Sequence, residues 1–276
     1  MSSAFYVSDG GGFVSTEITR GPWDGASQHA GPPAALIGRE VERCPSPVAG
    51  ERSWQVGRIT YEILRPVPIA PLTVTARVER PGRSVELVSA SLRSEEGEVI
   101  RALAWRVAVG EVELPAGLAS EDSGSPARRG PAPPAPAAGS VEDFFPTGFE
   151  VGYHTAMEYR FTSGRFLDPG PAVVWMRMRH PLVEGEEPTP LQRVLIAADS
   201  GNGVSATLDW KRFLFINVDL TVHLHRLPAT EWVCLDAITV PEPTGLGMSD
   251  TALHDERGPI GRAVQTLLIR ERSTGA

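Results

Sequence analysis

Cysteine is scarce in this chain: it has two cysteines, Cys44 and Cys234, among 276 residues. Neither belongs to a Cys-x-x-Cys motif, so the sequence offers neither a zinc site nor a disulfide framework. Isolated cysteines of this kind are usually small buried side chains. Their scarcity is typical of a reducing compartment, and we expect the protein to be cytoplasmic.

Long hydrophobic runs and clusters of basic residues are also missing. No apolar stretch reaches the roughly 18 residues that a membrane helix needs, and the N-terminus does not have the pattern of a signal peptide. The formal net charge is −8. Nucleic-acid backbones are held by clustered Lys and Arg, and the chain has no such cluster. We therefore expect neither a nucleic-acid nor a membrane partner.

Proline, alanine, glycine and serine are concentrated in one segment, "SEDSGSPARRGPAPPAPAAGSVED". This composition gives little to pack into a core and is typical of an extended linker. It divides the chain into two parts of similar size. We predict an N-terminal repeat over residues 1–110, a linker over 111–147 and a C-terminal repeat over 148–276.

The two parts share a register of strands and turns. The alternating pattern "ITYEILRP" ends at Arg65, and a similar pattern in "VDLTVHLHRLP" ends at Arg226, 161 residues later. The same offset pairs the turn glycines Gly97 and Gly258, which precede the β-rich segments "IRALAWRVAV" and "GRAVQTLLIR". Alternation of apolar and polar residues indicates strands. Each part is therefore predicted to contain an antiparallel sheet.

Each part also has one helical pattern ahead of its strands. The segments are "GPPAALIGREVERC" and "TPLQRVLIAADSG", and both have proline where a helix begins. A sheet of this kind buries one face against a helix. We predict an α+β fold of two tandem repeats, each a long central helix wrapped by an antiparallel sheet.

A carboxylate interrupts the apolar face of the second helix. Asp199 lies four residues after Leu195 and three after Ile196, so helical spacing places it on their buried face. A buried carboxylate is costly unless hydrogen bonds compensate it or its charge is needed. Asp199 is therefore a candidate catalytic residue. The alternative is that it caps local structure before "SGNG".

Two amides are candidates to accompany this carboxylate. Gln265 falls in the apolar row of the last strand, and its counterpart at the 161-residue offset is Ala104. The counterpart of Asn217 is Val56. An unpartnered buried amide would cost roughly 1–3 kcal/mol, so polar residues at two such positions suggest one polar site, in the second repeat.

Both amides also have structural interpretations. Gln265 could satisfy a backbone group in the core. Strand parity places Asn217 on the solvent face, and only a β-bulge near "FLFIN" would turn it inward. His223 and His225 share a strand face, but no carboxylate–histidine set accompanies them, so we expect no metal. His29, before the first helix, is either an acid–base or acyl-carbonyl donor or a neighbour of the helix cap.

Together these segments resemble the acyl-CoA thioesterase II family and its thioesterase-like relatives, which have a double hotdog fold. The resemblance covers nearly the whole chain outside the linker. It implies an enzyme of lipid metabolism that hydrolyses acyl-CoA thioesters to free acid and CoA, needs no cofactor and forms a homodimer or larger oligomer. It rests on "HAGPPAAL", "VGRITYEILRP" and "RSVELVSASLRSEEGEVIRALAWRV" in the first repeat and on "LIAADSGNG", "NVDLTVHLHR" and "AVQTLLIR" in the second.

The resemblance also implies an active site in which an Asp, a Thr or Ser, and a Gln hold a hydrolytic water. Asp199 and Gln265 match the Asp and the Gln, and Asn217 stands where Thr or Ser is usual. Hydrolysis by water needs a base and donors for the developing oxyanion. We assign Asp199 as the base and expect the two amides to position the water.

Three residues of the first repeat are candidate substrate contacts: Gly31, whose N–H lies at a helix start, His29, and Thr60 on the strand before the Arg-Pro pair. The substrate could be an acyl-CoA or an acyl carrier protein thioester. Two other functions stay open. One is an acyl-thioester hydratase or dehydratase, which would need a catalytic histidine beside an acid, and the other is a non-catalytic acyl-binding protein.

Overall fold

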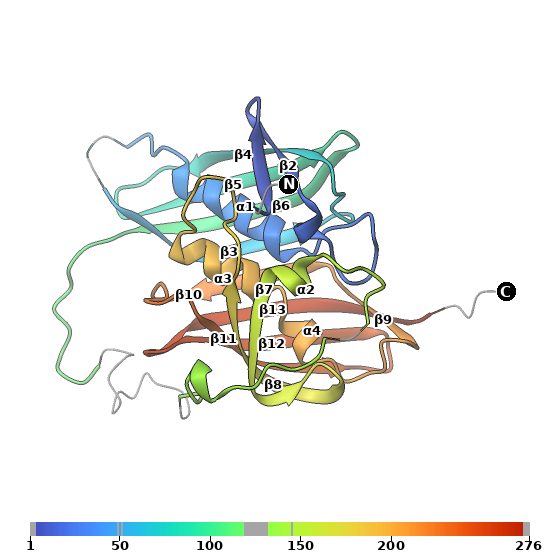
Figure 1. Ribbon diagram of the computed structural model, residues 1–276. Helices are drawn as coiled ribbons and strands as arrows, with labels where there is room; N and C mark the ends of the chain where they lie inside the picture. The colour runs from blue at the N-terminus through green and yellow to red at the C-terminus, as the bar shows by residue number, and fades with distance from the viewer. Residues whose placement is uncertain (1–3, 49, 51, 119–131, 145, 273–276) are drawn as a thin grey trace.

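The computed structural model describes residues 4–48, 50, 52–118, 132–144 and 146–272. The predicted linker therefore lies partly outside the described residues. Thirteen strands of the described chain form one continuous sheet, in which neighbouring strands are antiparallel (Figure 1). Along the sheet the order is β1-β2-β4-β5-β6-β3-β10-β13-β12-β11-β8-β7, and β9 pairs with β13 at one end of that strand.

The strands of the first repeat are β1 (Tyr6–Asp9), β2 (Gly12–Ser15), β3 (Trp54–Ile63), β4 (Pro71–Arg80), β5 (Val85–Ser94) and β6 (Gly97–Ala108). Those of the second are β7 (Met157–Arg165), β8 (Asp168–Met178), β9 (Phe213–Asn217), β10 (Asp219–Leu224), β11 (Val233–Pro241), β12 (Leu246–Asp255) and β13 (Gly258–Glu271). The bounds of the two repeats themselves stay a prediction.

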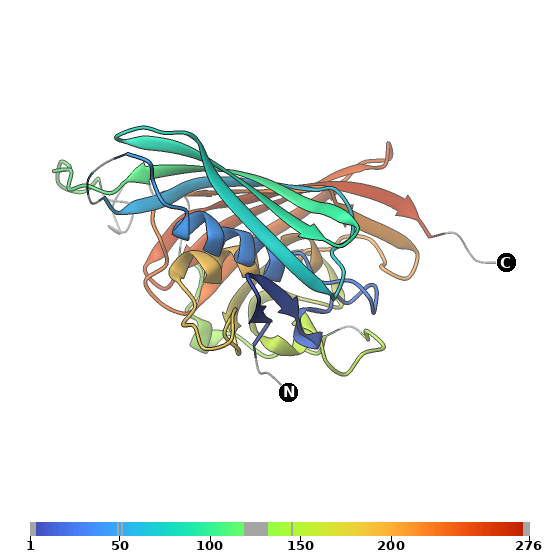
Figure 2. The ribbon, with the colours of Figure 1, turned by 90° about the horizontal axis from the view of Figure 1, so that it is seen from above.

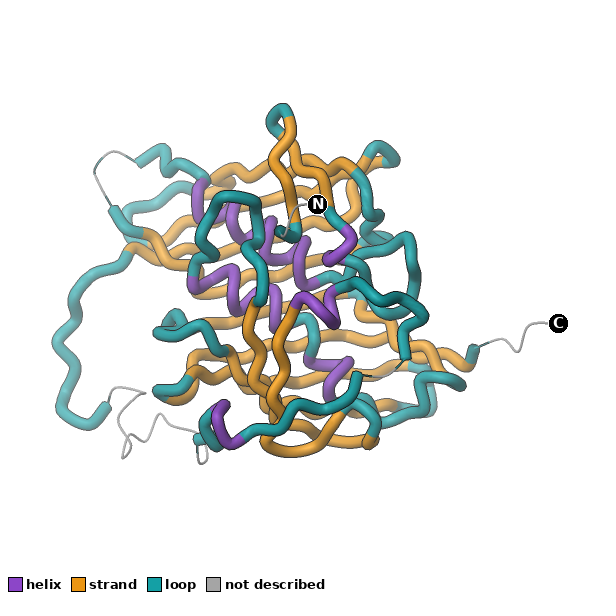
Figure 3. Tube along the Cα trace, in the orientation of Figure 1, coloured by secondary structure: helices purple, strands orange, loops and turns teal. Residues whose placement is uncertain are grey.

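Two helices of more than one or two turns lie side by side on one face of this sheet, α1 (Gly31–Arg43) and α3 (Pro190–Ala198). Figure 2 shows the sheet curving over them, and Figure 3 shows them gathered at the middle of that face. The other helical turns are short: η1 (Glu17–Thr19), η2 (Pro136–Ala138), α2 (Tyr153–Ala156) and α4 (Gly201–Val204). A long central helix in the second repeat is not confirmed, because α3 has nine residues.

Glycines let α1 and α3 approach closely. A Cβ atom added at Gly38 would overlap the side chain of Leu195, and one added at Gly31 would overlap the backbone oxygen of Ile196. Interiors pack densely, so such overlaps are not tolerated without a shift. The two helices therefore meet backbone against side chain at Gly38 and backbone against backbone at Gly31, and this contact fixes the end of α3 next to the start of α1.

The seam between β3 and β10 carries the internal symmetry that the sequence offset predicts. Thr60 lies opposite Thr221, the residue 161 positions later, and the hydroxyl of Thr221 donates to that of Thr60 at 3.1 Å. The predicted turn glycines also match, because Gly97 and Gly258 have φ angles of 123° and 129°. Residues other than glycine rarely adopt such angles. The offset is thus a structural equivalence as well as a sequence pattern.

A β-bulge separates β9 from β10. Asn217 lies opposite Leu267 and Thr221 opposite Val264, so three residues on one strand face two on β13. Val218 is 43% exposed, whereas Leu220 is 1% exposed. Directly opposite residues share a face, and Leu267 is buried, so the extra residue turns Asn217 toward the interior. The bulge that the sequence required for an inward Asn217 is present.

A buried ion pair ties the first repeat together. Arg106 pairs with Glu86, and its guanidinium also donates to the backbone oxygens of Val41 and Cys44, each at 2.8 Å. These oxygens lie at the C-terminal end of α1, where a positive charge is favourable. Both cysteines are free and buried. No helix in the described part of the chain is long and apolar enough to cross a membrane.

Candidate active site

A cavity of about 520 Å³ lies at the junction of the two repeats, beside the C-terminal end of α3. Segments that are distant in sequence meet around it: the loop before α1, the loop after β3, α2, the start of α4, β9 and β13. Most of its wall is apolar. Four of the candidate residues contribute to the wall: His29, Asp199, Asn217 and Gln265.

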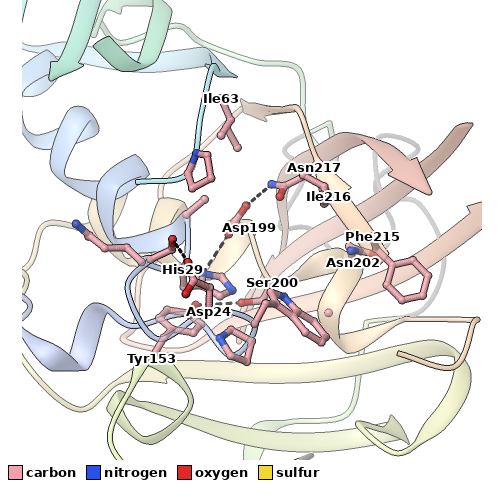
Figure 4. Close-up of a pocket in the computed structure, with 18 of the residues that line it drawn as sticks. Asp24, His29, Ile63, Tyr153, Asp199, Ser200, Asn202, Phe215, Ile216 and Asn217 are labelled. Carbon is pink, nitrogen blue, oxygen red and sulfur yellow. Dashed lines mark hydrogen bonds and ion pairs between the residues drawn. The ribbon is translucent and has the colours of Figure 1, made fainter. Parts of the chain in front are cut away.

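Figure 4 shows Asp199 between His29 and Asn217. Asp199 is the C-cap residue of α3, directly after Ala198, and its side chain is 5% exposed. Its Oδ1 atom accepts hydrogen bonds from Nδ2 of Asn217 at 2.7 Å and from Nε2 of Gln265 at 3.1 Å. Asp199 thus occupies the C-cap position of α3, and its carboxylate hydrogen-bonds to two distant strands.

Gln265 is held at both ends of its amide. Its Nε2 atom also donates to the backbone oxygen of Asp199 at 3.1 Å, and its Oε1 atom accepts the N–H of Asn202 at 3.2 Å. Gln265 is 2% exposed, in the apolar row of β13 that the sequence predicts. A buried amide is stable only when its polar atoms are paired. The partners of this one are Asp199, through both its carboxylate and its backbone oxygen, and Asn202. In the structure, both amides therefore bind the carboxylate.

His29 faces the other carboxylate oxygen. Its Nδ1 atom lies 3.1 Å from Oδ2 of Asp199. Its ring stacks on Tyr153, with centroids 3.8 Å apart and planes 10° from parallel. The Tyr153 hydroxyl donates to the backbone oxygen of Ile196 at 2.7 Å and lies 3.0 Å from Oγ of Ser200. The imidazole is therefore fixed between the carboxylate and a tyrosine that is itself anchored to α3.

Burial controls the protonation of these rings. Desolvation lowers the pKa of His29 from its ordinary value of 6.5, although the charge of Asp199 acts to raise it. Burial raises the pKa of the Tyr153 phenol, so Tyr153 stays protonated and acts as a donor. At neutral pH the imidazole is neutral and can accept a proton.

Two candidate residues are not on the cavity wall. Thr60 lies at the β3–β10 seam, where it bonds Thr221. The N–H of Gly31 donates a hydrogen bond to Nδ1 of His29 at 3.1 Å, so Gly31 is joined to the site through that ring. Nδ1 of the neutral ring therefore has the lone pair that accepts from Gly31, and its hydrogen is on Nε2.

Sequence reasoning did not find several wall residues. Tyr153 and Ser200 support the histidine, and Phe144, His154, Tyr159 and Phe166 form an aromatic wall from the end of the linker through the turn after β7. Nor did it pair His29 with Asp199. No local pattern marks these residues, because each reaches the site through tertiary packing.

Other charged side chains also contribute to the cavity wall. Asp24 and Arg65 are exposed residues of two loops, and Arg272 follows β13. The cavity therefore combines a mostly apolar wall with charged side chains, which suits an amphiphilic ligand. Among the described residues, no group of three or more His, Cys, Asp or Glu side chains is placed to hold a metal ion.

Comparison with family models assigns both parts of the chain. Residues 19–107 match the acyl-CoA thioesterase N-terminal domain, and residues 128–269 match the acyl-CoA thioesterase C-terminal domain. The second match alone covers more than half of the chain. The chain belongs to the acyl-CoA thioesterase family. No curated protein matches it.

Solved structures agree on the fold of this acyl-CoA thioesterase family member. A candidate thioesterase II from Thermobifida fusca is 17% identical with a TM-score of 0.72, over 97% of this chain and 96% of that one. A hot dog fold protein from Alicyclobacillus acidocaldarius is 15% identical with a TM-score of 0.69, over 99% and 97%. An acyl-CoA thioesterase II from Mycobacterium marinum is 16% identical with a TM-score of 0.64, over 89% and 90%. The fold is thus hotdog, as the resemblance implied.

Proposed function

We propose that this chain hydrolyses acyl-CoA thioesters to a free acid and CoA. Family membership supports thioester hydrolysis in general terms. The observation that supports this chemistry here is the Asp199 carboxylate, which is buried on the wall of a largely apolar cavity beside an imidazole. A fixed negative charge next to a proton acceptor is what activation of water requires.

The two amides keep this charge in place. Asn217 and Gln265 donate to the same oxygen of Asp199, so the carboxylate cannot rotate away from His29 without losing hydrogen bonds. Charge-assisted hydrogen bonds of this kind are stronger than neutral ones. Asn217, which stands where the family resemblance implies Thr or Ser, performs this holding role with an amide donor.

The shape of the cavity supports an acyl-CoA substrate. The acyl group would lie against the aromatic wall, and the thioester would reach Asp199 and His29. Arg65 and Arg272 would lie toward the charged end of the ligand, where the phosphates of CoA favour positive side chains. The start of α1 is a poor source of oxyanion donors, because the N–H of Gly31 already donates to Nδ1 of His29 and Pro32 and Pro33 have no N–H.

Thiol release over a panel of acyl-CoA substrates of different chain length tests the proposal. Asp199→Asn keeps the shape but removes the charge, and we expect kcat/KM to fall by about 10²–10⁴-fold. Gln265→Ala should also lower it. Asp236→Asn, at an exposed position of β11, is the matched control and should leave thiol release unchanged. If Asp199→Asn matches the wild type on every substrate, the proposed role of this carboxylate is wrong.

One observation favours a second candidate, an acyl-thioester hydratase. Such an enzyme needs a histidine beside an acid, and the sequence showed no acid partner for His29. The structure places Asp199 3.1 Å from it. The same panel should therefore include an enoyl-CoA. Loss of the enoyl absorbance without thiol release would favour hydration, and thiol release without that loss would favour hydrolysis.

A further inference from the structure

We propose that the acyl group of the substrate contains an aromatic ring, which binds against the aromatic wall of the cavity. This inference rests on the proposed hydrolysis and names its substrate class, an arylacyl thioester such as a phenylacetyl group joined to CoA. Three features of the wall support it: its place beside the carboxylate of the site, the packing of its rings, and its lack of charge.

The aromatic rings of the cavity form a series that starts at the carboxylate. Tyr153 stacks on His29, whose Nδ1 atom lies 3.1 Å from Oδ2 of Asp199. The next residue of α2 is His154, a member of the aromatic wall. His154 stacks in turn on Phe144, with ring centroids 5.1 Å apart. An acyl group whose thioester lies at Asp199 therefore has this series of rings beside it.

The rings of the wall pack edge to face around Phe166. Its centroid lies 4.4 Å from that of Phe144, 5.1 Å from that of Tyr159 and 4.8 Å from that of Phe161. The corresponding angles between the ring planes are 62°, 76° and 73°. Phe161 is 3% exposed and belongs to the core. The wall is therefore backed by the core, which holds its rings in fixed orientations.

The segment that ends the linker is attached to β7 so that it completes the wall. Ser140 and Phe161 exchange two backbone hydrogen bonds, each 2.9 Å long. Four residues after Ser140, Phe144 contacts both His154 and Phe166 on the cavity wall. A segment that only connected the two repeats would need neither the hydrogen bonds nor an aromatic side chain at the cavity.

The four residues of the wall are uncharged at neutral pH. Burial lowers the pKa of His154 from its ordinary value of 6.5, so its imidazole is neutral. Burial raises the pKa of Tyr159, so its phenol stays protonated. A free carboxylate on the acyl group would lose its hydration here without meeting a cation, which is costly. The wall therefore favours an apolar ring over a dicarboxylic acyl group.

The aliphatic part of the cavity does not distinguish a ring from a chain. Ile63, Leu214 and Ile216 line it, and such side chains bind any apolar group according to the area that is buried. An aromatic ring on the ligand gains a further contribution from aromatic side chains, beyond that area. A saturated ring with the same number of carbons lacks this contribution. The two kinds of ring therefore separate the aromatic effect from simple burial.

Phenylacetyl-CoA, cyclohexylacetyl-CoA and octanoyl-CoA, whose acyl groups have the same number of carbons, provide the test. We measure kcat/KM for thiol release and divide each value by the rate of alkaline hydrolysis of the same thioester, which removes differences in intrinsic reactivity. We expect the corrected value for phenylacetyl-CoA to exceed that for cyclohexylacetyl-CoA by about 2–12-fold, and to exceed that for octanoyl-CoA as well. An equal or lower value for phenylacetyl-CoA would overturn the proposal.

Phe166→Leu tests whether the wall is the source of this preference. Leucine keeps an apolar side chain but removes the ring, so the ratio of phenylacetyl-CoA to cyclohexylacetyl-CoA should fall toward one. Phe144→Leu should have the same effect, and it supplies the readout if Phe166→Leu does not fold. Phe213→Leu, at a partly buried position of β9 that is not on the cavity wall, is the matched control and should keep the ratio. An unchanged ratio in both wall variants would overturn the proposal.

The same panel separates this inference from the proposed hydrolysis. If the wild type releases thiol from octanoyl-CoA and shows no preference for the aromatic ring, hydrolysis stands and this inference fails. If it releases thiol from no acyl-CoA, both are wrong. A preference for phenylacetyl-CoA that the wall variants lose would support both.

Discussion

The two repeats share a backbone plan but differ in the chemistry of their interiors. Thr60 and Thr221, which are 161 residues apart, lie opposite each other at the centre of the seam, and the neighbouring pairs are arranged symmetrically about them. Where the second repeat has Gln265, the first has Ala104, which is completely buried. Asn217 similarly corresponds to Val56, which is 3% exposed. The two amides of the candidate site therefore have buried apolar counterparts in the first repeat.

The repeats also differ in how they bury charge. Arg226 of the second repeat pairs with Asp255, a carboxylate with no exposed side-chain surface that also accepts the N–H groups of Ala229 and Arg257. The counterpart of Arg226 is Arg65, an exposed residue that donates to a backbone oxygen. A buried charge thus appears where several donors converge on it, and the equivalent position without them keeps its arginine in solvent.

Removing one partner of this ion pair should have the largest effect on stability. Arg226→Met leaves Asp255 buried without its cation, and we expect the free energy of unfolding to fall by about 3–5 kcal/mol. Arg65→Met removes the exposed counterpart and should change it by less than about 0.5 kcal/mol. Urea unfolding of both variants measures the difference. Equal losses would mean that the two arginines are equivalent after all.

The same pair predicts an acid dependence. Burial alone would raise the pKa of Asp255, but hydrogen bonds from Arg226, Ala229 and Arg257 outweigh it, so the pKa is lowered. A lowered folded-state pKa stabilises the protein above the unfolded value of about 3.9, and this stability is lost as pH falls through the folded pKa. The stability difference between wild type and Asp255→Asn should therefore shrink below about pH 4. A constant difference would contradict this assignment.

Placing the amide of the second repeat into the first should be the next largest effect. Ala104→Gln buries an unpartnered amide and overfills a packed position, and together these should cost about 2–5 kcal/mol in the free energy of unfolding. Leu103→Gln, at a neighbouring residue of β6 that is 41% exposed, is the control and should cost far less. Tolerance of Ala104→Gln would show that the apolar interior of the first repeat is not required.

Exchange of Asn217 should have the smallest effect. Asn217→Thr keeps a donor near Oδ1 of Asp199, so kcat/KM for thiol release should stay within about tenfold of the wild type, roughly 1.4 kcal/mol. Asn217→Val keeps the shape of threonine but has no donor, and should lose more activity. Equal activity of the two variants would show that the hydrogen bond to Asp199 does not matter.

Much of the framework could be predicted because it depends on local patterns. Period-two alternation placed β3, β6 and β13, and the turn glycines Gly97 and Gly258 have the positive φ angles that their place between strands requires. The burial of Asp199 followed from helical spacing. The long helix predicted for the second repeat is not confirmed, because α3 ends at Ala198 after nine residues.

The site could be predicted only in part. Asp199 and Gln265 are where their patterns placed them, but strand parity pointed Asn217 outward, and the bulge at Val218 reverses that parity. Thr60 was a candidate by its place on β3, yet its side chain bonds across the seam instead. A register shift or a seam contact depends on the partner strand, which a single segment does not reveal.

By itself, the amino-acid sequence determined the strands, the turns, the two helices and the presence of a carboxylate among apolar residues, because each depends on neighbours a few positions away. Only the tertiary structure decided that His29 meets Asp199 and stacks on Tyr153. That meeting needs α1 and α3 to touch, which Gly31 and Gly38 permit by having no side chain at the contact. His29 and Asp199 are 170 residues apart in the sequence. The contact between them depends on the packing of α1 against α3, which no local pattern predicts.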